Sequence, residues 1–135
     1  MRSKGGLGVV FAIAVVAAGF TATGCGSSKP SYCTPTSGLK TDVSKLTGDV
    51  TSANFSAVQS DVTTIQNDAK KVVSDAKSDF PDETNAVDSS ITSLSDAVNA
   101  LPSSPSAQQI LALVPKVTSA VNAVESLSGA VASKC

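Results

Sequence analysis

The sequence predicts an all-α fold, an up-down-up-down antiparallel bundle of one short and three longer helices that follows a signal peptide and a flexible tether. Beyond residue 38, apolar residues recur at alternating steps of three and four, a spacing that places them along one face of a helix. Pro and Gly residues interrupt these runs where helices are expected to end. No run shows the strict apolar-polar alternation of a half-buried strand. Because only 4% of the residues are aromatic, the core must consist mainly of Val, Leu, Ile and Ala.

The first two helices are expected at residues 38–47 and 54–79. Gly48 is a candidate stop for the first helix, so residues 49–54 are expected to form a loop. The apolar run of the first helix is Leu39, Val43 and Leu46. The second helix has a longer heptad stripe, made of Phe55, Val58, Val62, Ile65, Ala69, Val72 and Ala76.

A third helix is expected at residues 82–101, after Pro81. Proline suits the first turn of a helix, and the carboxylates of Asp82 and Glu83 suit its positive end. The apolar stripe of this helix is Val87, Ile91, Leu94, Val98 and Leu101.

The last helix is expected at residues 105–133, with a proline inside its pattern. Pro115 has no N–H group and cannot donate a hydrogen bond to Leu111, so we expect a kink or a break at that point. A short helix before Pro115 and a long helix after it both fit. The stripe of this segment is Ile110, Val114, Val117, Val121 and Val124.

The N-terminus has the pattern of a cleaved signal peptide over residues 1–24. Arg2 and Lys4 give a short positive region, and a 14-residue uncharged apolar run follows at residues 7–20. This run is shorter than the roughly 20 residues that a membrane-spanning helix needs. The pattern therefore predicts export rather than a transmembrane helix.

The segment Ala22-Thr23-Gly24-Cys25 resembles a bacterial lipobox, in which small residues precede a cysteine. In such precursors the cysteine thiol receives a diacylglyceryl group, with acyl chains such as palmitate, and signal peptidase II cuts before it. The position three before the cysteine is usually Leu, and here it is Ala22. Ordinary signal-peptidase cleavage would cut the same bond, so the two readings differ only in the fate of Cys25. Residues 25–37 are expected to be the lipidated cysteine and a tether rich in Gly, Ser, Thr and Pro.

Cysteine parity favours lipidation of Cys25. The chain has three cysteines, and an odd thiol is reactive in an oxidising compartment. If Cys25 carries lipid, Cys33 and Cys135 remain as a disulfide pair. Four antiparallel helices in the domain 38–135 would bring this pair together at one end, whereas three helices would separate them.

Composition argues against several classes of function. The chain has no His, so a Ser/His/Asp triad is excluded, and with all three cysteines assigned there is no zinc site and no cysteine nucleophile. No Gly-rich phosphate loop lies between a strand and a helix. The formal net charge is −1 and the pair Lys70–Lys71 is the only basic cluster, so a nucleic-acid surface is not expected. We expect a protein without catalytic residues, metal or cofactor.

Two acidic groups are candidate binding sites. Asp61, Asp68 and Asp75 recur every seven residues, but their spacing of about 10 Å along a helix is too wide for one metal ion. A solvated rim beside the apolar stripe explains them better than a ladder for a cation or a basic partner. The second group, which could hold calcium, crowds the second loop and consists of Asp75, Asp79, Asp82 and Glu83. Charge at a helix N-terminus explains its last two members more simply.

The chain resembles a known class of envelope protein. The lipobox-like ATGC at 22–25, an early Cys33, the segments VVSDAKSDF at 72–80 and VDSSITSLSDAVNALPSSPSAQQI at 87–110, and Cys135 resemble small Ala/Ser/Val-rich lipoproteins of actinobacteria, especially of the mycobacterial type. The resemblance implies a helical fold and an envelope location, and it carries over no catalytic residues.

These observations together predict a lipoprotein held on the outer face of the cell membrane by the lipid on Cys25. Its bundle is expected to be a structural or interaction module for an envelope protein or ligand that the sequence does not identify. The alternative is a carrier of a small hydrophobic ligand or lipid in a cavity between helices, opened by a kink at Pro115. A filled core would favour the module, and a cavity would favour the carrier.

Overall fold

The structure is a computed structural model that describes residues 29–135. The predicted signal peptide, the lipobox with Cys25 and the first residues of the tether lie outside the described residues. The described part contains only helices and their connections: α1 (Cys33–Thr51), α2 (Phe55–Ala76), α3 (Pro81–Asn99), α4 (Ala107–Leu111) and α5 (Val114–Ala132).

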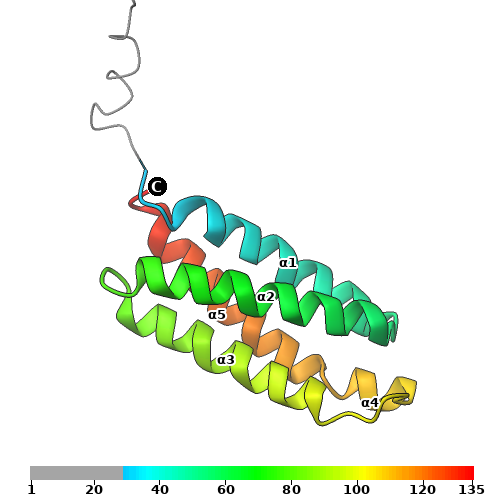
Figure 1. Ribbon diagram of the computed structural model, residues 1–135. Coiled ribbons are helices and arrows are strands. Elements are labelled where there is room, and N and C mark those ends of the chain that lie inside the picture. The colour runs from blue at the N-terminus through cyan, green and yellow to red at the C-terminus, as the bar shows by residue number, and fades with distance from the viewer. Residues whose placement is uncertain (1–28) are drawn as a thin grey trace, which may run out of the picture.

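The four long helices form an antiparallel bundle, as predicted (Figure 1). Helix α1 packs against α2 and α5, and α3 packs against the same two helices. The chain runs down α1, back along α2, down α3 and back along α5, so the end of α5 lies beside the start of α1 (Figure 1). Helix α4 is a single short piece at the opposite end.

The core is built from small and medium aliphatic side chains, as the composition requires. Tyr32 is the one fully buried aromatic residue of the described chain. The stripes predicted for the first three helices are buried, except that Phe55 and Leu101, at the ends of their stripes, are half-buried. The largest fully buried hydrophobic residues are Leu39, Leu46, Ile65, Leu94, Leu127, Val43, Val50, Val58, Val72, Val87 and Val124.

Helix α1 is longer at both ends than the predicted span of 38–47. It begins at Cys33, so residues 33–37 are helical rather than part of a tether. Pro35 lies in the first turn, where its missing N–H group would have no helical acceptor. Gly48 does not stop the helix. Its Cβ position faces open space on the outer side of α1, and the helix continues for another turn because Val50 is buried in the core.

The connection from α1 to α2 is a three-residue turn closed by backbone hydrogen bonds. The N–H groups of Ala53 and Asn54 donate to the carbonyl oxygens of Val50 and Asp49, both at 3.0 Å, which is the Schellman pattern. Ala53 has a φ of 55°, the one non-Gly residue of the described chain with a positive φ. The Asn54 side chain then accepts from the Ala57 N–H and caps α2. This turn replaces the longer loop expected at 49–54.

The break at Pro115 is confirmed. Helix α4 ends at Leu111, and α5 begins at Val114 with Pro115 in its first turn. A reciprocal capping box between Ser106 and Gln109 starts α4. The break changes the helical phase, so Leu113 is buried while Val114, predicted to be in the core, is 43% exposed.

Candidate functional site

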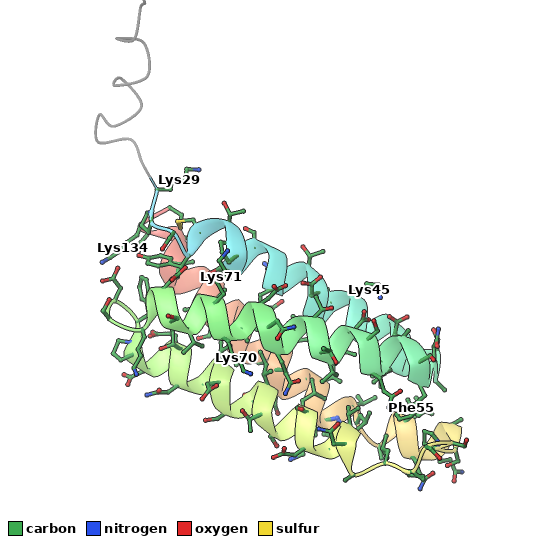
Figure 2. The ribbon with its side chains drawn as sticks, in the orientation of Figure 1. Lys29, Lys45, Phe55, Lys70, Lys71 and Lys134 are labelled. Atoms are coloured by element: carbon green, nitrogen blue, oxygen red, sulfur yellow. A yellow bond between two sulfur atoms is a disulfide. The ribbon has the colours of Figure 1, made fainter. Side chains whose placement is uncertain are left out.

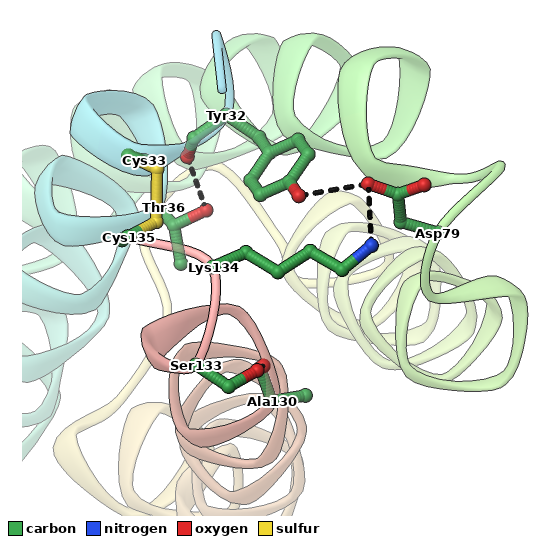
Figure 3. The surroundings of a disulfide bond; sticks show 8 residues. All are labelled: Tyr32, Cys33, Thr36, Asp79, Ala130, Ser133, Lys134 and Cys135. Atoms are coloured by element: carbon green, nitrogen blue, oxygen red, sulfur yellow. Dashed lines mark hydrogen bonds and ion pairs between the residues drawn. A yellow bond between two sulfur atoms is a disulfide. The ribbon is translucent and has the colours of Figure 1, made fainter. Parts of the chain in front are cut away.

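The two cysteines at the ends of the described bundle lie together. Cys33 is the first residue of α1 and Cys135 follows the end of α5, and their Cα atoms are 5.9 Å apart with the sulfur atoms joined in a disulfide (Figure 3). The bond spans 102 residues of sequence. The even number of long helices brings the two cysteines to one end, as predicted. The aromatic pair Tyr32–Phe80 and the ion pair Lys134–Asp79 lie at this disulfide-bonded end.

Tyr32 connects this end to the turn between α2 and α3. Its ring packs edge-to-face against Phe80 with 5.7 Å between ring centroids. Its hydroxyl donates a hydrogen bond to Asp79 Oδ2 at 2.8 Å (Figure 3). The side chain is buried, so the ring and hydroxyl attach the start of α1 to the turn 77–80.

The starts of α1 and α3 are built alike. Tyr32 and Phe80 are the residues immediately before these helices. Each of their carbonyl groups accepts a hydrogen bond from a buried threonine four residues later, Thr36 at 2.6 Å and Thr84 at 2.7 Å. These bonds satisfy hydroxyl groups that would otherwise be buried without partners.

Lys134 closes the cluster from the end of the chain. Its Nζ lies 3.4 Å from Asp79 Oδ2 and 5.6 Å from the centroid of the Phe80 ring. The hydrogen bond from Tyr32 and then that from Lys134 lower the pKa of the Asp79 carboxyl. Burial and the hydrogen bond to Asp79 raise the pKa of the Tyr32 hydroxyl. The carboxylate at Asp79 therefore holds three chain segments together.

Sequence reasoning found the cysteine pair and missed Tyr32 and Lys134. It placed Asp79 in a possible calcium cluster, whereas the structure gives Asp79 the partners Tyr32 and Lys134. No group of three or more His, Cys, Asp or Glu residues in the described residues could hold a metal ion. One signal was available: the single tyrosine of the chain stands directly before Cys33.

The predicted acidic ladder lies at the contact between α1 and α2 and is partly neutralised. Lys45 Nζ lies 2.8 Å from both Asp49 and Asp61. These two partners raise the pKa of the Lys45 ammonium. Burial raises the pKa of Asp42, and the neighbouring carboxylate of Asp68 raises it further. Two of the three ladder residues thus face α1 rather than a separate ligand.

The opposite end of the bundle exposes apolar surface. Leu111 and Val114, on either side of the break between α4 and α5, are each 43% exposed and are the exposed large hydrophobic residues of the described chain. Figure 2 shows Phe55 at this end and Lys29 and Lys134 at the disulfide-bonded end. We call this end the distal end. It is formed by the turn 52–54, the loop 100–106 and α4.

No pocket is present in the part of the chain that the structure describes, residues 29–135. The segment Ala107–Ala132 is apolar and long enough to cross a membrane, but α5 contributes Val117, Val124 and Leu127 to the core of the bundle. Its apolar character therefore fits a core helix.

Comparison with protein-family models, curated proteins and solved structures finds no match to this chain. Its function must be inferred from its own residues and geometry.

Proposed function

We propose that this chain is an exported lipoprotein, anchored to the outer face of the cell membrane by a lipid on Cys25, whose helical bundle is a structural or protein-interaction module. One observation supports the proposal most strongly. The bond between Cys33 and Cys135 pairs two of the three cysteines, so Cys25 is the cysteine that remains for another role. It stands directly after the apolar N-terminal segment, at the position of a lipobox cysteine.

The geometry of the bundle suits such an anchor. Cys25 precedes Cys33 by eight residues, which span at most about 29 Å when fully extended. The disulfide-bonded end is thus kept near the membrane. Helix α1 has 19 residues and is about 28 Å long, so the distal end projects by about that distance when the bundle stands upright.

The packing supports a module rather than a carrier. Aliphatic side chains from all five helices fill the core of the described bundle, and nearly all of them are less than 5% exposed. A carrier needs a preformed apolar cavity for its ligand. The apolar surface lies outside instead, at Leu111 and Val114 of the distal end, where a partner could bury it.

The anchor is tested by expressing the chain in an actinobacterial host and fractionating the cells. We expect the wild-type protein in the membrane fraction, with the mass of a diacylglyceryl group on an N-terminal Cys25, because two acyl chains give stable anchoring. Cys25→Ser should be released in soluble form. The matched control is Cys33→Ser with Cys135→Ser, which should remain in the membrane fraction. An unmodified Cys25 in the mature wild-type protein would contradict the proposal.

The module is tested by crosslinking on intact cells followed by affinity capture. Leu111→Ser with Val114→Ser should lose the crosslinked partner, because these substitutions remove apolar contact area at the distal end. The control is Thr63→Ala with Thr64→Ala on the exposed face of α2, which should keep it. A lipid or other small apolar molecule that copurifies with the Cys25→Ser protein, seen by native mass spectrometry, would favour the carrier instead.

A further inference from the structure

The disulfide is asymmetric in its exposure. Cys33 is half-buried and packs against the edge of the hydrophobic core, whereas Cys135 is exposed. A thiolate reduces a disulfide by approaching one sulfur in line with the bond, so access to that sulfur limits the reaction. Of the two sides of this bond, the side of Cys135 is the more open to solvent.

The two sulfurs also differ in their suitability as leaving groups. Cys33 is the first residue of α1, where the positive end of the helix stabilises a negatively charged thiolate. Cys135 follows Ala132, the last residue of α5, where the negative end of a helix disfavours a thiolate. The sulfur that leaves as the more stable thiolate leaves faster. Both exposure and leaving-group quality therefore point to attack at Cys135 and departure of Cys33.

We propose that the Cys33–Cys135 bond is a thiol-exchange site for a dithiol reductant, with Cys135 Sγ as the sulfur attacked. A thiolate of the reductant forms a bond to Cys135 Sγ, and the bond between the two sulfurs breaks with its electron pair on Cys33 Sγ. The second thiol of the reductant then loses its proton and attacks the first sulfur of the same reductant molecule, which is the one bonded to Cys135 Sγ in the mixed disulfide. This step releases the Cys135 thiolate, so the reductant is oxidised to a disulfide and the protein is reduced to two thiols.

Exchange at this bond would loosen one end of the bundle. Lys134 and Cys135 lie beyond α5, where the Lys134 side chain makes a half-exposed ion pair with Asp79 and lies over the Phe80 ring. An exposed ion pair contributes little by itself. Tyr32 stays attached through its hydrogen bond and its packing on Phe80. Reduction is thus expected to free residues 133–135 first and to leave the four-helix core folded.

The experiment uses the exported full-length chain with Cys25→Ser, so that its outcome is independent of lipidation. The folded protein is incubated with reduced glutathione, which gives a mixed disulfide that lasts long enough to trap. The reaction is then stopped by acid, free thiols are alkylated, and glutathione is located by peptide mass spectrometry. We expect glutathione on Cys135 in at least about threefold excess over Cys33, since the better leaving group departs faster.

A second measurement separates exchange in the folded state from exchange after unfolding. The rate of reduction by dithiothreitol is compared with the rate of global unfolding, which is obtained from hydrogen exchange of the core amides of α2. We expect reduction to be at least about tenfold faster, and to rise in proportion to thiolate concentration, because it needs no global opening. Reduction at the rate of global unfolding, or glutathione found mainly on Cys33, would overturn the proposal.

Discussion

Tyr32 shows how a single side chain joins parts of the sequence that are far apart. Its hydroxyl bonds a carboxylate that is 47 residues away, and its ring packs on Phe80 in the turn between α2 and α3. Asp79 accepts this bond as a carboxylate, and the bond lowers the pKa of Asp79. A carboxyl with a lowered folded-state pKa stabilises the fold above its ordinary value of 3.8, and this contribution is lost as the pH falls through the lower folded value.

We therefore expect Tyr32→Phe to lower Tm by a few degrees at pH 7, because the ring is kept and only the bond to the carboxylate is lost. The loss should shrink when Tm is measured at an acid pH well below 3.8, as the pH falls through the lowered folded-state pKa of Asp79. Thr41→Val, which removes an exposed hydroxyl bond within α1, is a control with no such dependence on pH. An equal loss at both pH values would contradict the role given to Asp79.

Asp42 presents the opposite case. Its folded-state pKa is raised above 3.8, first by burial and then by Asp68. A raised carboxyl pKa favours the folded state at low pH, and this contribution is lost as the pH rises through the folded value. At neutral pH the ionised Asp42 therefore destabilises the contact between α1 and α2.

Asp42→Asn should accordingly raise Tm by a few degrees at pH 7, because it removes charge repulsion with Asp68 and Asp61 at nearly constant shape. The gain should disappear near pH 3, where the carboxyl of the wild type is itself protonated. Thermal unfolding followed by circular dichroism at both pH values measures this. Asp88→Asn on the exposed face of α3 is the control, and a gain there of the same size would point to net charge instead.

At the scale of the elements, α1 has a glycine in its helical part, and the turn after it has an alanine with a positive φ. Each residue type is unfavourable in that conformation. Gly48 lies inside α1 with nothing near the position of its missing Cβ, and an interior glycine costs about 1 kcal/mol relative to alanine. Ala53 adopts a φ of 55° at the end of the helix, a conformation that costs a non-Gly residue about 1 kcal/mol.

Replacing Gly48 by alanine and Ala53 by glycine should therefore each stabilise the protein. We expect Gly48→Ala to add about 1 kcal/mol to the free energy of unfolding. Ala53→Gly should add about 0.5 kcal/mol, because relief of the strained φ exceeds the greater backbone entropy of glycine and the loss of one methyl contact. Urea unfolding measures both. Ala57→Gly, inside α2, is the control and should destabilise, so a gain there would contradict this explanation.

The helices themselves could be predicted from the sequence because apolar periodicity extends over many residues and reports burial directly. The stripe from Val58 to Ala76 is an example, since every predicted member within it is buried. Helix ends were harder to predict, because they depend on single residues with two possible roles. Gly48 was interpreted as a stop but sits on the outer face of α1, and the run Cys33 to Ser37 reads as a tether although Pro35 fits a first turn.

The misplacement of Val114 has a related cause. Its spacing from Ile110 and Val117 fits one continuous helix, and only that continuity puts it in the core. Once α4 ends at Leu111, the phase restarts and Val114 turns outward. The sequence predicted either a kink or a break at Pro115. A kink would keep Val114 on the buried face of one continuous helix, whereas the break places it on the exposed side.

At the scale of the whole molecule, the pairing of Cys33 with Cys135 could be predicted from two numbers. Two cysteines remain if Cys25 carries lipid, and four antiparallel helices bring these two to the same end of the bundle. The Tyr32, Asp79 and Lys134 cluster could not be predicted, since it depends on which side chains meet at the end of the bundle. The segments 29–32, 77–80 and 133–135 come together only when the long helices have nearly equal lengths, of 19 to 22 residues.

The disulfide should dominate the stability of this small bundle. In the chain-entropy model, a bond that closes a loop of about 100 residues contributes about 4.7 kcal/mol, and here the sequence separation is 102. Cys33→Ser with Cys135→Ser should therefore lower Tm by about 20 °C for a domain of this size, while circular dichroism still reports a helical protein below Tm. Reduction of the wild type should give the same Tm as the double variant.

The loss of the disulfide should also weaken the cluster beside it, which is the last prediction. Tyr32 adjoins Cys33 and Lys134 adjoins Cys135, so the disulfide fixes the two partners of Asp79 relative to each other (Figure 3). Tyr32→Phe should then lower Tm less in the Cys33→Ser, Cys135→Ser background than in the wild type, because residues that share a restrained contact are not additive. Thr41→Val, remote from the disulfide, should have the same effect in both backgrounds. Equal effects of Tyr32→Phe in the two backgrounds would show that the hydrogen bond to Asp79 forms independently of the covalent closure.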